Sequence, residues 1–124
     1  MRLLLDSHVL LWLLAGDPIA PAAARAVESL DNEVWVSVAT IWELEIKQAI
    51  GKLELDDDLV AATLGAGLDL LEIRSEHVVH AARLPMHHRD PFDRLLVAQA
   101  TLEGAAIVTR DAALRSYQVT LLDA

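Results

Sequence analysis

The chain has 124 residues, a net charge of −9, 54% hydrophobic residues, 4% aromatic residues and no cysteine. This length suits one domain whose sheet is covered on both faces. The composition excludes a disulfide scaffold, a thiolate metal site and a cysteine nucleophile, and the negative charge argues against a broadly basic nucleic-acid surface.

The first half of the chain alternates short apolar runs with helical patterns. Arg2 to Asp6 is apolar enough for a central parallel strand, and Val34 to Ser37 predicts a second buried strand. Gly16 with Asp17-Pro18 ends the first predicted helix, Asp31-Asn32 the second and Gly51 the third. The predicted helices of this half are Ser7 to Ala15, Pro21 to about Leu30, Val38 to Ile50 and about Asp57 to Ala66.

The second half continues the alternation. Its predicted strands are Leu70 to Ile73, Ala106 to Thr109 and Val119 to Leu122. Its helices are Ser75 to Leu84, a helix that begins at Asp90-Pro91 and ends at Glu103, and a short turn from Asp111 to Arg115, with a loop from Pro85 to Arg89.

Strands separated by helices predict right-handed βαβ units. We therefore expect an α/β fold, a three-layer α/β/α sandwich with a mostly parallel five-stranded sheet. No linker or low-complexity segment divides the chain, so we expect one domain over residues 1–124. No early apolar stretch approaches the roughly 20 residues that span a bilayer, which favours a cytoplasmic protein without a membrane partner.

Four acidic residues fall at one edge of this predicted sheet. Asp6, Glu43 and Asp111 follow the first, second and fourth strands, and Asp93 begins the helix that runs antiparallel to strand four. Carboxylates about 5 Å apart repel by about 3 kcal/mol per pair at an effective dielectric constant of about 20. The edge therefore predicts a divalent cation site, because carboxylate oxygens are the ligands that such ions prefer.

Each acid also has a structural alternative as a helix cap. Asp6 and Asp111 suit N-cap positions, and Thr40 with Glu43 forms a capping-box pattern. Asp90 before Pro91 is the best cap, which leaves Asp93 in the first turn. Caps need not be acidic, so the shared edge favours metal binding by Asp6, Glu43 and Asp93 first and Asp111 second, with Asp90 in a secondary role.

The charge is unevenly distributed. Residues 31–76 hold eleven acids and three bases, whereas residues 77–115 hold five arginines, four acids and four histidines. Arg89, Arg94 and Arg110 lie beside members of the acidic set, and we expect them to contact substrate phosphates. Thr109 and Ser37 suit either a hydroxyl that orients a carboxylate or water, or an ordinary strand end, and we expect Thr109 to contact the substrate as well.

We expect structural rather than catalytic roles for the following histidine and tryptophan residues. His87 and His88 are adjacent, so they cannot both face one site, and we expect a solvated loop pair. Trp35 and Trp42, on a buried strand and a helix face, are expected in the core.

Four stretches together resemble PIN-domain ribonucleases, specifically the VapC toxins of bacterial and archaeal toxin-antitoxin pairs. In chain order they are LLLDSHVLLWLL, VSVATIWELEIKQAIGKL, HRDPFDRLLVAQA and IVTRDAAL. The resemblance covers essentially the whole chain. It implies that the four family acids are Asp6, Glu43, Asp93 and Asp111, with Asp90 as an additional acid of this HxxDPFDR-like branch.

The resemblance also implies an activity and partners. The family activity is Mg²⁺- or Mn²⁺-dependent cleavage of RNA phosphodiester bonds, the toxin is commonly a homodimer, and a cognate VapB-like antitoxin blocks the site. We therefore expect an endoribonuclease, a hydrolase, with these four acids as its catalytic and metal-binding residues.

Two alternative functions are also compatible with an α/β domain of this size. One is a catalytically silent PIN-type module that binds RNA or protein. The other is a Mg²⁺-binding receiver-type signalling domain, which would need an acid pair after strand one, an Asp at the end of strand three and a Lys after the last strand, and the chain has none of these.

Overall fold

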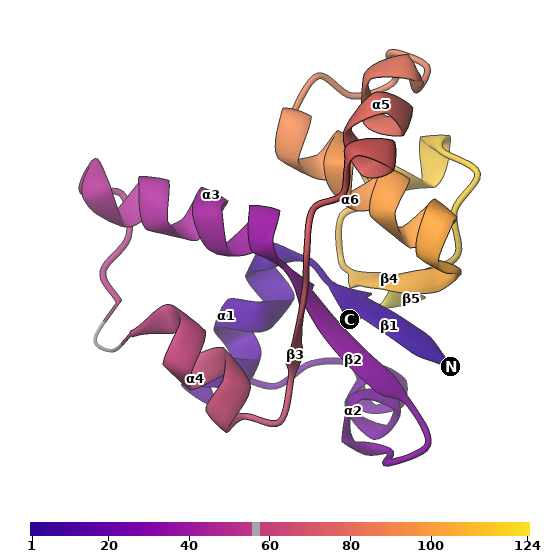
Figure 1. The fold of residues 1–124 in the computed structure, drawn as a ribbon. Coiled ribbons are helices and arrows are strands. Elements are labelled where there is room, and N and C mark those ends of the chain that lie inside the picture. Colours follow the sequence, from indigo (N-terminus) through magenta and orange to yellow (C-terminus); the bar gives the residue numbers. More distant parts are fainter. Residues whose placement is uncertain (56–57) are drawn as a thin grey trace.

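The strands form one sheet in the order β3-β2-β1-β4-β5, shown in Figure 1. The computed structural model describes residues 1–55 and 58–124. The strands are Arg2–Leu5 (β1), Glu33–Ser37 (β2), Asp69–Leu71 (β3), Ala105–Thr109 (β4) and Leu121–Asp123 (β5). Each neighbouring pair in that order is parallel. The five-stranded α/β prediction is confirmed, and the receiver-type alternative is excluded because receiver domains order their strands 2-1-3-4-5.

The described helices are Ser7–Ala15 (α1), Pro21–Glu28 (α2), Val38–Ala49 (α3), Leu59–Gly65 (α4), Ser75–Arg83 (α5), Pro91–Glu103 (α6) and a 3₁₀ turn Ala112–Ser116 (η1). The predicted boundaries agree within a few residues. The expected start of the fourth helix at Asp57 lies outside the described residues, and Asp58 caps α4 through the backbone N–H of Ala61. None of the described helices is both long and apolar enough to cross a membrane.

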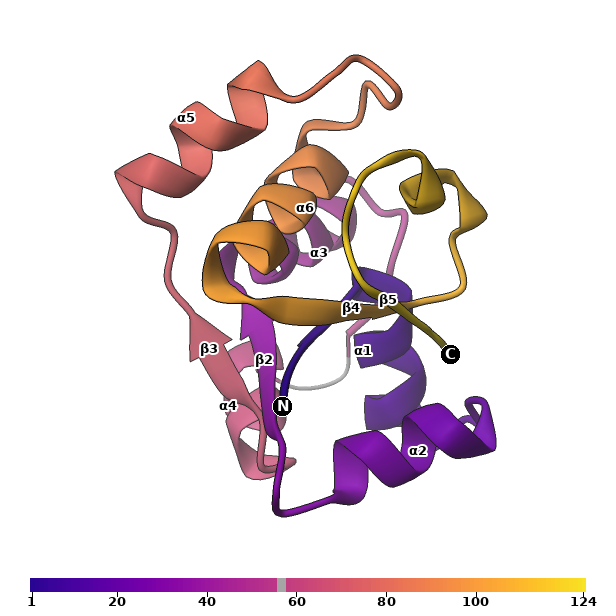
Figure 2. The same cartoon turned by 90° about the vertical axis from the view of Figure 1, so that its right-hand side faces the viewer.

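Two apolar layers cover the sheet because the leucines of β1 alternate between its faces. Leu3 and Leu5 pack in one core with residues of α1, α2 and α4. Leu4 packs in the other core with α6 and η1. Figure 2 shows α1 and α2 on one side of β4 and α6 with α5 on the other.

Helix α3 continues directly from β2 and projects beyond the sheet, where it contacts both α1 and α6. This placement contradicts one expectation for the core. Trp42 is 60% exposed, because only the face of α3 with Ile41 and Leu44 reaches the core. Its ring meets Phe92 edge-on, with the ring centroids 5.3 Å apart. Trp35 is half-buried, and the Arg2 guanidinium lies 4.9 Å from its ring centroid.

Candidate metal centre

Asp6 lies at the carboxyl end of β1, where the chain turns into α1. It is the N-cap of that helix, and its Oδ1 accepts a hydrogen bond of 2.8 Å from the backbone N–H of Val9. Its Oδ2 accepts a hydrogen bond from the Thr109 hydroxyl. Leu5 pairs with Val108, so the parallel register brings Thr109 beside Asp6. The Asp6 carboxylate is therefore buried and fixed from two sides.

Thr109 also holds Asp111. The Thr109 hydroxyl oxygen accepts a 2.9 Å hydrogen bond from the Asp111 backbone N–H, while Asp111 Oδ1 caps η1 through the N–H of Ala113 at 2.9 Å. Thr109 is only 1% exposed, so the expectation that it contacts substrate is wrong. It instead positions two carboxylates that are 105 positions apart in the chain.

Asp90 and Asp93 have different roles at the start of α6. Asp90 is the N-cap, and its Oδ1 accepts from the backbone N–H groups of Phe92 at 2.8 Å and Asp93 at 3.3 Å. Asp93 lies in the first turn, with its carboxylate bonded to a histidine side chain instead: His88 Nε2 lies 2.6 Å from Asp93 Oδ2.

The expectation of a solvated histidine pair is wrong for His88. Its ring is only partly exposed and contacts the Asp93 carboxylate in the site. His87 points elsewhere, with its ring centroid 5.2 Å from that of Tyr117. The two adjacent histidines face different surroundings, as predicted, but the contact of His88 with the acids was not predicted.

Three donors meet closely enough to share one ion. One potential ligand atom from each of His88, Asp93 and Asp111 lies within 4.8 Å of the other two. Carboxylate oxygens and an imidazole nitrogen are common ligands of divalent cations. The residues present therefore fit a divalent metal. We call these three residues, together with Asp6 and Glu43, the acid edge.

Glu43 approaches the acid edge from α3. Its Oε2 lies 3.4 Å from Lys47 Nζ, and its charge helps to raise the pKa of Asp93. The capping-box alternative is wrong, because the N-cap of α3 is Ser37, whose hydroxyl accepts from the N–H of Ala39 at 3.1 Å. Thr40 is instead buried inside the helix, so Glu43 has no capping role.

The surroundings of Asp93 favour its neutral form. Burial raises the pKa of Asp93 most strongly, the His88 hydrogen bond and charge oppose this, and the charges of Asp90 and Glu43 raise it further. The net pKa is above the ordinary aspartate value. A bound cation would offset both the burial and the repulsion, because it stabilises the ionised carboxylate.

Arg94 has no hydrogen bond to a side chain of the acid edge. It is 7% exposed, so the expectation of a phosphate contact is wrong. On α6 it follows Asp93 by one position and therefore points about 100° away from it. Its guanidinium, together with the Tyr117 hydroxyl, forms what we call the arginine network. The acceptors of its hydrogen bonds include Ala81 O, Leu84 O, Pro85 O, His88 O and Tyr117 Oη, at 2.9 to 3.3 Å.

Arg110 is also occupied elsewhere. Its Nε donates to Ala124 O at 2.6 Å and its Nη2 to Pro18 O at 3.1 Å. Its guanidinium carbon lies 4.0 Å from the centroid of the Trp12 ring. These contacts turn Arg110 toward the end of α1, which contradicts its expected phosphate contact. Arg89 is exposed beside His88 and Asp90, so its phosphate contact stays a prediction.

A protein-family model described as PIN domain matches residues 3–119. The chain belongs to the PIN-domain family. A comparison with curated proteins gave no match. The order of the acids along the chain and their common edge were predicted from the sequence, and the family match covers every one of them.

Solved structures resemble this PIN domain over nearly its whole length. VapBC2 from Rickettsia felis, bound to a promoter DNA fragment, matches with a TM-score of 0.76 and 14% identity over 99% of this chain and 98% of that chain. VapBC-1 from nontypeable Haemophilus influenzae matches at 0.71 and 20% over 99% and 98%. FitAcB from Neisseria gonorrhoeae matches at 0.69 and 18% over 97% and 96%. These similarities show the same fold.

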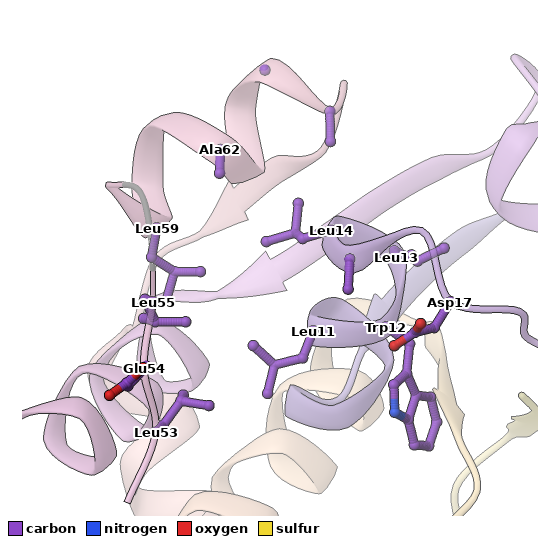
Figure 3. Close-up of a pocket in the computed structure, with 13 residues that line it drawn as sticks. Leu11, Trp12, Leu13, Leu14, Asp17, Leu53, Glu54, Leu55, Leu59 and Ala62 are labelled. Atoms are coloured by element: carbon purple, nitrogen blue, oxygen red, sulfur yellow. The ribbon is translucent and has the colours of Figure 1, made fainter. Parts of the chain in front are cut away.

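The PIN domain also has an apolar groove away from the acid edge. A cavity of about 630 Å³ lies between α1, α4 and residues 53–55. Figure 3 shows leucines of α1 facing Leu53, Leu55 and Leu59 across it. None of the acid-edge residues lines this cavity. The groove and the candidate metal centre are therefore separate surfaces.

Proposed function

We propose that this PIN domain is a metal-dependent endoribonuclease that hydrolyses RNA phosphodiester bonds with Mg²⁺ or Mn²⁺. The observation that supports this most directly is the cluster of His88, Asp93 and Asp111 donor atoms within 4.8 Å of one another. Glu43 adds negative charge beside Asp93, and Asp6 is tied to the same edge through Thr109. Ionised carboxylates this close together repel one another, and a bound cation would offset that repulsion.

Asp6, Glu43, Asp93 and Asp111 would hold the cation. Two of them are fixed before it arrives, because Asp6 and Asp111 are helix caps joined through the Thr109 hydroxyl. When bound, the cation supplies an acidified water and stabilises the charge that develops on the phosphate. The described site needs no side-chain nucleophile for this chemistry.

Arg89 is our candidate for the phosphate contact. It is exposed in the loop between His88 and Asp90, next to the acid edge. A guanidinium there would offset part of the local negative charge and could bind a phosphate with two parallel hydrogen bonds. Thr109 acts only indirectly, by positioning Asp6 and Asp111.

We further propose that the protein is a VapC-like toxin, neutralised by a cognate antitoxin, and that it forms a homodimer. The structures it resembles include VapBC2, VapBC-1 and a toxin-antitoxin complex from Klebsiella pneumoniae. The apolar groove between α1 and α4 is a candidate surface for such a partner, and it is lined by none of the acid-edge residues.

The test of catalysis is cleavage of a panel of cellular RNAs by purified protein with Mg²⁺ or Mn²⁺, and with EDTA. We expect cleavage that EDTA stops and that Asp6→Asn removes. Asn caps a helix as well as Asp does, so this variant removes charge while keeping the cap of α1. Asp58→Asn is the matched control, because Asp58 caps α4 in the same way.

Several outcomes would contradict the proposal. Cleavage that survives EDTA would exclude the metal-dependent mechanism, and full activity of Asp6→Asn in excess Mg²⁺ would exclude Asp6 from the cation site. RNA binding without any cleavage would instead favour the silent binding module.

The antitoxin proposal is tested separately. The protein encoded by the neighbouring gene should bind the toxin and stop cleavage. Light scattering of the toxin alone gives its oligomeric state.

A further inference from the structure

The His88 ring lies among the carboxylates of the acid edge, where it forms one donor cluster with Asp93 and Asp111. Its Nε2 is 2.6 Å from Asp93 Oδ2, and its ring donor is within 4.8 Å of the donors of both Asp93 and Asp111. Donor atoms this close to one another can bind the same cation. The side chains of His88 and Asp93 are only partly exposed, at 28% and 27%, whereas Asp111 is exposed.

The backbone of His88 is held in place from two directions. Its N–H donates to the Tyr117 hydroxyl at 3.0 Å, and its carbonyl oxygen accepts from Arg94 Nη1 at 3.3 Å. The same two side chains also donate to Pro85 O, at 3.0 Å from Arg94 and 3.1 Å from Tyr117. The arginine network therefore fixes the loop so that the His88 ring faces Asp93, which resembles the positioning of a ligand.

A nitrogen donor changes which ion such a site prefers. Mg²⁺ binds oxygen donors and keeps several waters, whereas first-row transition metals gain more from an imidazole ligand. His87, one residue earlier, has the same chemistry, but its ring meets that of Tyr117 edge-on and is not part of the cluster. The choice between an all-oxygen site and a mixed site therefore depends on His88.

We propose that His88 is a direct metal ligand, and that with Asp93 and Asp111 it forms a mixed nitrogen and oxygen site that prefers Mn²⁺ to Mg²⁺. This inference rests on the proposed function, because it concerns the same cation site. The alternative role for His88 is a positioning residue that only holds Asp93 by a hydrogen bond.

The test measures metal binding to the full chain without RNA. Electron spin-echo spectroscopy of bound Mn²⁺ should show coupling to a ligand ¹⁴N nucleus in the wild type and in His87→Gln, and none in His88→Gln. Calorimetric titration should show Mn²⁺ binding weakened about tenfold or more in His88→Gln and Mg²⁺ binding changed by less than about twofold.

The control and the variant are matched in chemistry. Both replace an imidazole by an amide, and His88→Gln keeps the backbone contacts with Tyr117 and Arg94 that hold the loop. Circular dichroism melting of each protein checks that the fold is retained.

Absence of ¹⁴N coupling in the wild type, its persistence in His88→Gln, or equal weakening of Mn²⁺ and Mg²⁺ in that variant would each overturn the inference. RNA cleavage is scored separately. Nitrogen coupling in a protein that cleaves no RNA supports the ligand assignment and refutes the nuclease, whereas Mn²⁺-dependent cleavage without coupling refutes only the ligand assignment.

Discussion

Asp93 and Arg94 are neighbours on α6, yet the two regions they belong to differ in how completely their charges are partnered. The guanidinium of Arg94 donates to several carbonyl oxygens of the 81–88 segment and to Tyr117. The Asp93 carboxylate has one side-chain hydrogen bond, from His88, and lies near the charges of Asp90 and Glu43. The arginine network is complete within the protein, whereas the acid edge is not.

We infer from this difference that the arginine network stabilises the fold and that the acid edge binds a ligand. A buried charge with a full set of hydrogen bonds fixes the chain around it and has nothing left to offer a ligand. A cluster of carboxylates whose negative charge is only partly neutralised by its neighbours destabilises the fold. A bound divalent cation would supply the missing positive charge. The predictions below test this contrast, from the largest expected effect to the smallest.

Arg94→Ala should cause the largest loss of stability. It leaves the loop carbonyls without their donor in a buried site, so we expect the free energy of unfolding to fall by about 3–5 kcal/mol. Urea denaturation followed by circular dichroism measures this. Arg89→Ala, which changes an exposed arginine of the same loop, should shift stability by less than about 0.5 kcal/mol. Equal decreases in the unfolding free energy of the two variants would show that the hydrogen bonds of Arg94 stabilise the fold no more than an exposed arginine does.

Asp93→Asn should reverse that pattern, with a large effect on catalysis and a small one on stability. We expect metal-dependent RNA cleavage to fall by about 10²-fold or more, because the variant removes a carboxylate from the cation site. The unfolding free energy in EDTA should change by less than about 1 kcal/mol.

Asp90→Asn is the matched control for this variant. Asn keeps the N-cap of α6, so we expect most of the activity to remain. If Asp90→Asn lost more activity than Asp93→Asn, the division of roles between these two acids would be the opposite of the one proposed.

The acid edge could be foreseen because its location depends on topology alone. Short apolar runs between helical patterns predicted the five strands of the described residues, and parallel strands place the residues that follow β1, β2 and β4 at one edge. Gly104, with φ of 65°, ends α6 where the sequence predicted. The positions of Asp6, Glu43, Asp93 and Asp111 therefore followed from the element order without knowledge of any side-chain contact.

The arginine network could not be foreseen, because its acceptors are backbone carbonyls. Every residue has a carbonyl, so no sequence pattern reveals that residues 81–88 converge on one guanidinium. The same applies to His88 and Trp42, whose surroundings depend on how the loop and α3 pack against α6. Local patterns predict elements, but the direction of a polar side chain depends on its tertiary neighbours.

Thr109→Val should show a smaller effect that falls on both properties. It removes the hydroxyl that donates to Asp6 and accepts from the Asp111 N–H, so we expect about 1–2 kcal/mol lower stability. Metal affinity, measured by calorimetry, should fall about tenfold, as when a residue that supports metal ligands is lost.

Thr101→Val is the matched control, because the Thr101 hydroxyl donates to the Val97 carbonyl within α6 and has no contact with the acid edge. It should leave metal affinity unchanged. Equal metal affinity in the two valine variants would mean that Thr109 does not position the carboxylates.

The pH dependence of Asp93 should give the smallest effect, and its sign distinguishes an empty acid edge from a filled one. Because the pKa of Asp93 is raised in the folded protein, the folded state binds this proton more tightly than the unfolded chain does. Ionisation of Asp93 therefore lowers the stability of the fold as pH rises from the ordinary pKa of 3.8 through the raised pKa, and the loss is complete above the raised pKa.

In EDTA, the unfolding free energy of Asp93→Asn relative to wild type should rise across this pH interval and then level off. With saturating Mn²⁺ the difference should change sign, because the cation stabilises only the ionised carboxylate. A relative stability of the variant that falls with pH in EDTA would show that His88 compensates the Asp93 charge fully, and the contrast between the acid edge and the arginine network would then fail.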